Sequence, residues 1–321
     1  MKRILIVLLI WANSCVLLAQ DAVMTQFFNA PLANNPALAA HGDRSLNLYT
    51  NYRQQWIGAS SSYNTMLASL TGKILKGKID KNSSLGVGGM FMSDLSLDGA
   101  FRSTYASFNV AYLLSLDPQG KSKVGLGLAG LYGSRRIDFS QLTFSQQFSS
   151  DGFNTTLPTG ESAIGAMNDY VSMSAGMLFT HRQQKTNIVF GAAGYHFNTP
   201  RQTSVSDVYE RLPTRYVVHG SVESFTSSRL SIMFTTLYQS QAANDYFTGG
   251  IVTTLYPQGE EGTQQIAAGL FYRNTKTVSP YVGFSRKSMR FGLTYDVNLS
   301  SEGLFANAMK AWELGMTIGI K

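Results

Sequence analysis

The sequence predicts an all-β fold, a transmembrane antiparallel β-barrel of fourteen strands. Three observations predict this fold. Charged residues make up 14% of the 321 residues, whereas a soluble globular chain carries about 25%. Segments of roughly ten residues, the length of a tilted membrane-crossing strand, alternate large apolar residues with small or polar ones. Beyond the N-terminal region, no apolar run reaches the ~18 residues that a membrane-spanning helix needs.

Residues 1–19 are predicted to form a signal peptide. Lys2 and Arg3 give a positive start, residues 4–18 are mostly apolar, and Ala19 is a small residue at the expected cleavage point. Cleavage there removes Cys15, which is the only cysteine, so the mature chain has no thiol or disulfide chemistry. A lipid-modified Cys15 is the less favoured alternative.

Residues 20–45 are predicted to form an N-terminal extended arm. Pro31 and Pro36 fall within it, beside the pair Asn34-Asn35. Because proline fixes φ and removes a hydrogen-bond donor, the arm is expected to stay out of the strand ladder. We expect it to plug the lumen or to dock a periplasmic partner.

Residues 46–321 are predicted to form the barrel itself. An even number of strands is typical of a closed single-chain bacterial barrel and places both chain ends on the periplasmic side. The expected strands are 46–57, 62–71, 84–94, 101–114, 123–135, 169–181, 187–197, 215–226, 229–240, 245–256, 263–273, 277–286, 288–298 and 309–320.

The last two segments show the alternation most clearly. Large apolar residues occupy every second position from Met289 to Val297 and from Trp312 to Ile320. The positions between them are polar, charged or glycine. This pattern favours a lipid-facing apolar surface and a moderately polar lumen over a soluble sandwich, which would turn its large residues toward a core.

The lengths of the connections between the strands support one orientation of the barrel in the membrane. The longest, 136–168, 198–214 and 300–308, all follow odd-numbered strands and therefore fall at the same end of the barrel, as extracellular loops do. The connections at the other end are mostly short turns, and the lysine-rich connection 72–83 is the exception.

No catalytic residue is predicted. A Ser–His–acid arrangement needs side chains that converge on one point, and the four histidines are expected at separate places, with no hydroxyl or carboxylate predicted beside a histidine at the rim. His41 lies in the arm, and the other three lie at different levels of three strands: His181, His196 and His219.

No metal or cofactor site is predicted either. The sequence has no pair of cysteines and no His-x-x-x-His, and the acidic pairs Asp94/Asp98 and Glu260-Glu261 are read as solvated turns. The glycines at 86–89 and 125–127 lie inside strand patterns rather than before a helix, so we expect them to make room in the lumen rather than to hold a phosphate.

Nucleic acid is not an expected partner. The formal net charge is +7, but an exported chain has little access to nucleic acid. No basic cluster alternates with aromatic residues as a stacking platform requires. The densest basic stretch, Lys73 to Lys81, is expected to be a solvated strand end and turn.

Four polar residues stand out because they occupy strand positions: Arg53, Gln55, Asp296 and Glu313. The first and last strands of a closed barrel must pair, so Arg53 is expected to reach Asp296 or Glu313 in the lumen. An ion pair that fills the lumen is favoured over a contact with a ligand.

The arm contains four short motifs in order: Gln20-Asp21, Gln26-Phe27, Asn29-Ala30-Pro31-Leu32 and Asn35-Pro36-Ala37. These motifs resemble the opening of the mature chain in the PorP/SprF family of type IX secretion membrane proteins. Thr25 stands where the family has serine, and Ala30 looks inserted before Pro31. Tyr52-Arg53-x-Gln55-Trp56 and two closing segments, 292–300 and 312–315, also resemble the family, so the likeness covers both ends of the chain. The arm carries the most specific matches, which are candidate plug or partner contacts: Gln20, Asp21, Gln26, Phe27, Asn29, Pro31, Leu32, Asn35, Pro36 and Ala37.

The resemblance implies a non-enzymatic barrel of the bacterial outer membrane that accompanies the type IX secretion machinery. The implied partners are components of that machinery, the lipid bilayer, and an exported client that carries a C-terminal targeting domain. Some relatives support gliding motility by helping surface adhesins to appear. An outer-membrane channel or a fatty-acid-type lipid transporter is the alternative, because such transporters also use fourteen strands.

Overall fold

The computed structural model describes residues 21–42, 44–57, 61–74, 82–149, 152–158, 169–202, 211–259, 263–299 and 310–320. The expected signal peptide 1–19 with Cys15, the arm residue Gln20 and the pair Glu260-Glu261 lie outside the described residues. Within the described part of the chain, no helix has both the length and the apolar character needed to cross a membrane.

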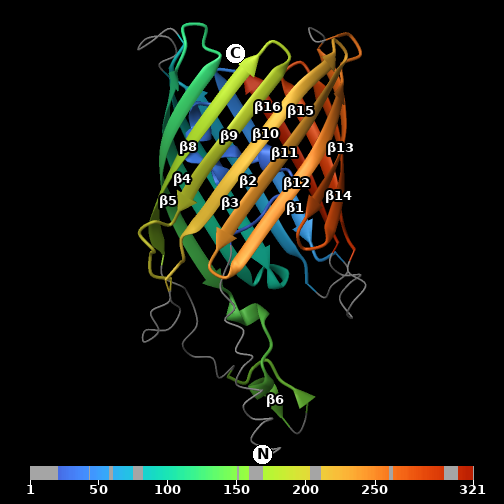
Figure 1. Ribbon diagram of the computed structural model, residues 1–321. Helices are drawn as coiled ribbons and strands as arrows, with labels where there is room; N and C mark the ends of the chain where they lie inside the picture. The colour runs from blue at the N-terminus through green and yellow to red at the C-terminus, as the bar shows by residue number, and fades with distance from the viewer. Residues whose placement is uncertain are drawn as a thin grey trace, which may run out of the picture.

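Fourteen antiparallel strands close into a barrel in which each strand pairs with its neighbours along the chain, and β1 pairs with β16 (Figure 1). The seam is in register, with Leu46 opposite Ile320 and Arg53 opposite Glu313. The barrel strands are β1 (Leu46–Gln55), β2 (Tyr63–Lys73), β3 (Ser84–Ser96), β4 (Phe101–Ser115), β5 (Ser122–Ile137), β8 (Tyr170–Gln183), β9 (Thr186–Tyr195), β10 (Arg215–Ser227), β11 (Leu230–Gln241), β12 (Asn244–Leu255), β13 (Gln264–Arg273), β14 (Thr277–Arg286), β15 (Met289–Asn298) and β16 (Ala311–Ile320).

The predicted fold class is confirmed. Each of the fourteen expected strands is present, with its ends within two residues of the expected positions. The alternation of large and small residues allowed this precision, because in a barrel that faces lipid outside and a lumen inside every strand carries the same period of two.

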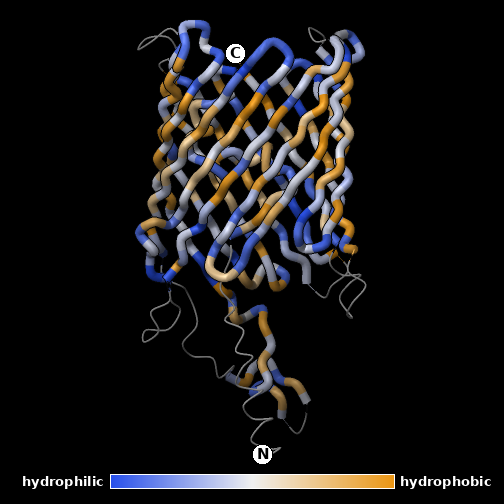
Figure 2. The backbone as a smooth tube through the Cα atoms, viewed as in Figure 1, coloured by the Kyte–Doolittle hydropathy of each residue, from blue (hydrophilic) through white to orange (hydrophobic). Residues whose placement is uncertain are grey.

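The two faces of the wall differ as the alternation predicted. On β15 the residues from Met289 to Val297 at every second position are exposed, whereas Thr294 and Asp296 between them are buried inside. Figure 2 shows apolar segments along the barrel wall and hydrophilic segments at both ends. The outer surface therefore suits the hydrocarbon of a bilayer.

The two ends of the barrel differ in their connections. We call the end with the short turns and the C-terminus the turn end, and the opposite end the loop end. From the loop end the β5–β8 connection projects away from the barrel (Figure 1). It contains two 3-10 turns, η4 (Phe139–Gln141) and η5 (Ser145–Gln147), and a small hairpin of β6 (Phe148–Ser149) and β7 (Gly152–Phe153). A further 3-10 turn, η3 (Leu97–Gly99), joins β3 to β4 at the same end.

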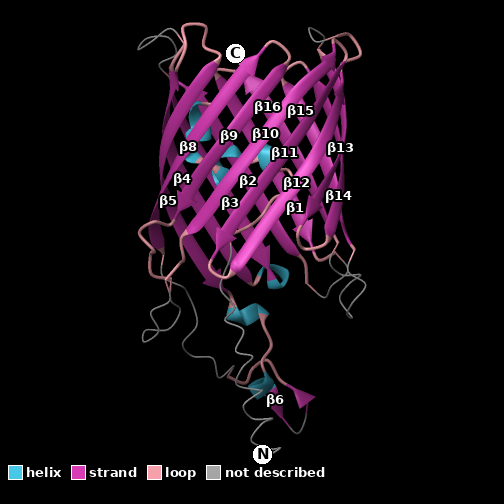
Figure 3. Ribbon diagram, viewed as in Figure 1, coloured by secondary structure: helices cyan, strands magenta, loops and turns pink. Residues whose placement is uncertain are grey.

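The arm is not extended, which corrects the sequence prediction. It forms three short helical turns, η1 (Phe27–Asn29), α2 (Pro31–Asn34) and η2 (Pro36–Ala40), which lie inside the barrel in Figure 3. Pro31 and Pro36 each stand at the start of a turn, where the missing N–H costs nothing and the fixed φ fits a helix. The side chain of Asn35 caps η2 by accepting a hydrogen bond from the amide of Ala37 at 2.9 Å.

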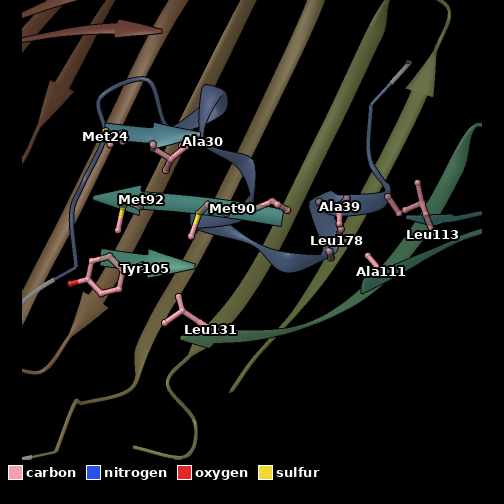
Figure 4. Packing of buried hydrophobic residues seen from close by; sticks show 14 of the residues in the cluster. Met24, Ala30, Ala39, Met90, Met92, Tyr105, Ala111, Leu113, Leu131 and Leu178 are labelled. Atoms are coloured by element: carbon pink, nitrogen blue, oxygen red, sulfur yellow. The ribbon is translucent and has the colours of Figure 1, made fainter. Parts of the chain in front are cut away.

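The apolar residues of the arm and the inward residues of the wall form the buried core. Figure 4 shows Ala39 beside Ala111, Leu113 and Leu178 of the wall. A second cluster places Phe27 among inward residues of β9 to β14. In this molecule the hydrophobic core thus lies inside the barrel, with the arm at its centre.

Inward glycines of the wall let the backbone of the arm approach closely. A Cβ at Gly127 would overlap the backbone of Pro36 and Ala37, and a Cβ at Gly86 would overlap that of Ala39 and Ala40. This confirms the expectation that these glycines make room in the lumen.

Candidate functional site

The first anchor of the arm is a buried ionic network between β1, β15 and β16. Arg53 Nη2 lies 2.5 Å from Asp296 Oδ2, and Arg53 Nη1 lies 3.1 Å from Glu313 Oε2. All three side chains are at most 3% exposed. The expected pairing of Arg53 with acids of the closing strands is therefore present. Arg273 of β13 joins the network, with Nη1 3.4 Å from Asp296 Oδ2.

The arm supplies a hydroxyl and two backbone amides to this network. Thr25 Oγ1 accepts hydrogen bonds from Arg53 Nη1 at 2.8 Å and from Arg273 Nη2 at 2.6 Å, and donates to Asp296 Oδ1 at 3.2 Å. The two oxygens of Glu313 accept the amides of Thr25 at 2.8 Å and Gln26 at 3.0 Å. Since charge-assisted hydrogen bonds are roughly twice as strong as neutral ones, this contact fixes the arm in one register.

Polar side chains of η1 and its flank continue the contact along the same wall. Gln26 Nε2 donates to the carbonyl of Glu313 at 3.0 Å. Asn29 Nδ2 donates to the carbonyl of Thr50 at 3.0 Å and bonds to Asn51. Gln55, the fourth predicted lumen residue, accepts from Arg53 Nη2 at 3.4 Å and lies at the margin of the network.

The second anchor lies across the lumen, at the loop end of β9 to β11. Asp21 Oδ2 is 3.0 Å from His196 Nε2 and 3.3 Å from Arg215 Nε. The amide of Asp21 donates to Gln241 Oε1 at 3.0 Å. Arg215 also donates to the carbonyl of Ala33 at 2.8 Å, so one arginine holds the arm both at Asp21 and at α2.

The charge of Asp21 is set by these neighbours. Burial by itself would raise the pKa of the Asp21 carboxyl. The positive charge of Arg215 and the contact with His196 outweigh burial and hold the pKa well below its usual range. The carboxylate is therefore ionised at neutral pH and accepts its hydrogen bonds as an anion.

The same place contains a hydroxyl–imidazole–carboxylate chain that the sequence analysis did not foresee. Ser172 Oγ lies 2.7 Å from His196 Nδ1, and His196 Nε2 lies 3.0 Å from Asp21. The expectation that no hydroxyl or carboxylate would lie near a histidine was wrong, because β8, β9 and the arm meet only in the folded barrel. Ser172 is 0% exposed, so a substrate carbonyl has no route to its hydroxyl.

The middle of the arm makes fewer polar contacts. Asn35 Nδ2 donates to the carbonyl of Met177 at 2.8 Å and lies 3.1 Å from His219 Nε2. Tyr195 donates its hydroxyl proton to the carbonyl of Leu32 at 3.0 Å. Between the arm and β9 to β11 a cavity of about 150 Å³ remains, lined in part by Phe27 and His219.

The arm residues quoted for the family resemblance meet the wall at different levels. Asp21, Gln26, Asn29 and Asn35 make polar contacts, whereas Phe27, Leu32 and Ala37 pack in the two apolar clusters. Pro31 and Pro36 begin helical turns. Five wall residues that contact the arm were not predicted from the sequence. Each is a polar residue at an inward-facing position of its strand or at the strand's end, and this position in the alternating pattern could have identified them: Asn51, Ser172, Arg215, Gln241 and Arg273.

Metal-binding groups were sought in the same site. In the ranges that the structure describes, no three His, Cys, Asp or Glu side chains are placed to hold a metal ion. The carboxylates of both anchors instead face arginine or histidine, an arrangement that stabilises the anions without a cation from solution.

Comparisons with solved structures agree with this architecture. The chain is similar to the monoaromatic hydrocarbon channel CymD, with a TM-score of 0.50 and 11% identity over 91% of this chain and 93% of that one. The toluene transporter TbuX of Ralstonia pickettii gives a TM-score of 0.50 and 11% identity over 90% and 92%. The KdgM porin gives 0.40 and 6% over 86% and 99%. At these identities the likeness to CymD and TbuX shows the fold alone.

No curated protein matches the chain, but the family comparison covers nearly its whole length. Residues 16–318 match the family described as type IX secretion system membrane protein PorP/SprF. The barrel fold and this membrane family together point to the outer membrane. The match includes the arm, both anchors and the closing seam, and the chain therefore belongs to the PorP/SprF family of type IX secretion system membrane proteins.

Proposed function

We propose that this barrel is a partner-binding component of type IX protein secretion, and that its lumen is not a path for solutes. The observation that carries the proposal is the arm, which crosses the lumen between two buried ionic anchors. An open channel needs a continuous water-filled lumen. Here the arm occupies the lumen from Asp21 near the loop end to Gly42 near the turn end, and cavities of about 150 and 280 Å³ lie beside it.

The proposed orientation places the turn end in the periplasm and the loop end outside the cell. Short turns and chain ends are typical of the periplasmic side, and long loops are typical of the extracellular side. The arm then presents its last residues, His41 and Gly42, to the periplasm, where secretion components are accessible. An exported client carrying a C-terminal targeting domain is the proposed partner on the other side, at the projecting β5–β8 connection.

The role is non-enzymatic in this proposal. The one hydroxyl–imidazole–carboxylate chain found among the described residues is buried and serves to hold Asp21. Its serine bonds to Nδ1 and its carboxylate to Nε2, the reverse of the usual catalytic arrangement. We assign these residues to anchoring the arm.

Deletion of residues 21–40 tests the proposal. The deletion should abolish client secretion and the capture of secretion components, while the product still migrates as a heat-modifiable barrel. A matched control carries the same twenty residues in scrambled order, which preserves length and composition but removes the anchors. The control should fail like the deletion, and unchanged secretion in either variant would reject the proposal.

Conductance separates this proposal from the channel alternative. The intact barrel in a planar bilayer should show little steady conductance, and the deletion should open it, because the lumen then loses its filling segment. Steady conductance of the intact barrel, or uptake of fatty acid or monoaromatic hydrocarbon by vesicles that contain it, would favour a channel instead.

A further inference from the structure

The seam between β1 and β16 differs from the other strand pairings of the barrel. β1 and β16 lie at opposite ends of the chain, whereas the other pairs are consecutive barrel strands. Because the entropy cost of bringing two segments together grows with the length of chain between them, the seam is expected to form slowly. An unpaired seam in lipid would expose the N–H and C=O groups of two strand edges, so the barrel must close it.

The side-chain amide of Asn29 in the arm bonds to both strands of the seam. Its Nδ2 donates to the carbonyl of Thr50 on β1 at 3.0 Å and to that of Met316 on β16 at 3.5 Å. The hydroxyl of Thr317 on β16 donates to Asn29 Oδ1. Thr50 and Met316 are direct partners across the seam. These bonds can therefore form together only when β1 and β16 are paired in this register.

Gln26 of the arm adds contacts to the two closing strands. Its Nε2 donates to the carbonyl of Glu313 on β16 at 3.0 Å and to that of Gly292 on β15 at 3.3 Å. Glu313 Oε1 accepts the backbone amide of Gln26 and the side-chain amide of Asn51 on β1, each at 3.0 Å. One carboxylate oxygen of β16 thus binds the arm and β1 at the same time.

Two inward glycines of the closing strands make the space that these amides occupy. Gly292 of β15, Gly315 of β16 and Asn51 of β1 are successive partners in one row across the three strands. A Cβ at Gly292 would lie 2.5 Å from Gln26 Oε1, and a Cβ at Gly315 would lie 2.6 Å from Gln26 Oε1 and from Asn29 Nδ2. The wall beside the seam therefore has a slot, formed by Gly292 and Gly315, that receives the arm.

We propose that the arm is an intramolecular template that brings β1 and β16 together and sets their register when the barrel closes. The arm precedes β1 in the chain and binds β15 and β16, so its docking on the closing strands holds β1 beside them. A slip of one residue would exchange the inward and outward side chains of β1 and would separate Asn29 from its carbonyl partners. The inference is independent of the proposed function, since a chain without the arm closes more slowly but still reaches the barrel.

The test follows closure of the seam while the urea-unfolded chain refolds in detergent micelles. The chain from residue 20 onward has no native cysteine, so Leu48→Cys/Ile318→Cys introduces one pair, at positions directly opposite each other across the seam. A short bifunctional thiol reagent, added at successive times, cross-links the pair once the two strands are adjacent. In a second chain, Val87→Cys/Val110→Cys reports the local pairing of β3 with β4 in the same way.

The variant Gln26→Ala/Asn29→Ala should slow cross-linking of the seam pair about tenfold, because hydrogen bonds are lost from the step that aligns the strands. Cross-linking of the β3–β4 pair should keep its wild-type rate. The matched control is Asn35→Ala, which removes an arm amide that contacts β8 and β10 instead, and the seam rate should then stay within about twofold of wild type. Wild-type closure in the double variant, or an equal delay in the Asn35→Ala control, would overturn the inference.

A variant of the wall keeps the test decisive if the double variant does not fold. Gly315→Ala places a methyl group in the slot without altering the arm and should also slow cross-linking of the seam pair. Its control is Gly130→Ala, where a Cβ meets nothing within 4 Å. The chain that lacks residues 21–40 should show the longest delay. Closure of the seam at the wild-type rate in the Gly315→Ala chain or in the chain without the arm would contradict a template role.

Discussion

The two halves of the arm are held in the lumen by different means. The first half, from Asp21 to Asn29, is fixed by ion pairs and charge-assisted hydrogen bonds to strands on opposite sides of the barrel. The second half, from Pro36 to Ala40, lies against glycines and small apolar residues of β3 to β5. Charged contacts therefore fix the position of the first half of the arm. The second half approaches the wall closely because the facing wall residues are glycines, which have no side chain.

This difference indicates what each half tolerates. Substitution of one member of a buried ionic network is strongly destabilising, because the other members are left charged and unpaired. A contact between glycine and alanine is instead sensitive to a larger side chain, because a close-packed interior has no free volume to accommodate it. The three substitutions below test the two halves separately.

The largest effect is expected from Arg53→Met. It leaves Asp296 and Glu313 buried beside a single remaining arginine, and breaking a buried pair in this way costs about 3–5 kcal/mol. Denaturant unfolding in detergent, followed by the fluorescence of Trp56 and Trp312, measures the loss. The double variant Arg53→Met/Glu313→Met should recover part of it. A single-variant loss below about 1 kcal/mol would show that the network is solvated and does not anchor the arm.

A smaller effect is expected from Gly127→Leu. The new side chain would occupy the space of Pro36 and Ala37, so the second half of the arm must shift, at a cost of about 1–3 kcal/mol. Limited proteolysis should then cut the arm between Leu38 and Gly42. The control is Gly130→Leu on the same strand, where a Cβ meets nothing within 4 Å. Equal protease resistance in both variants would contradict the close approach of the arm.

The smallest effect is expected from Asp21→Asn, because asparagine keeps one oxygen that can accept the hydrogen bond of Arg215. Only the charge is lost, and the difference between a charge-assisted and a neutral hydrogen bond is about 1–2 kcal/mol. The pKa of the Asp21 carboxyl lies below its ordinary value of about 4. The ion pair therefore contributes full stability above about pH 5 and loses it as the pH falls below about 4.

The difference in unfolding free energy between wild type and Asp21→Asn is the quantity that checks this prediction. It should be constant from about pH 5 to 7 and should shrink in more acidic solution. A difference that grows on acidification would mean that Asp21 is protonated in the folded barrel.

The wall was predictable almost to the residue, whereas the conformation of the arm was not. The pattern from Met289 to Val297 repeats one local rule, outward apolar and inward small or polar, which needs no knowledge of distant contacts. The presence of Pro31 and Pro36 correctly predicted that the arm does not pair with the strands of the barrel. They were misread as signs of extension because proline suits the start of a helical turn equally well.

The candidate site was predictable only where closure of the barrel dictated a contact. Arg53 and Glu313 lie on the first and last strands, which must meet, so their pairing followed from topology. No comparable rule brings Ser172, His196 and Asp21 together. Strand pairing does not fix the position of the arm, which depends on its side-chain contacts with the inner face of the barrel. Those contacts were therefore found only in the structure.

The sequence by itself determined the membrane-facing wall, its strand boundaries and which residues of each strand face outward, because period-two patterning and hydrogen-bond closure in lipid leave few alternatives. The tertiary structure alone decided that the start of the arm is held by two ionic anchors on opposite sides of the lumen, and that the rest of the arm folds into helical turns inside the barrel. The physical reason is that contacts inside a barrel join residues far apart in the chain, and their partners are selected by shape and charge in three dimensions.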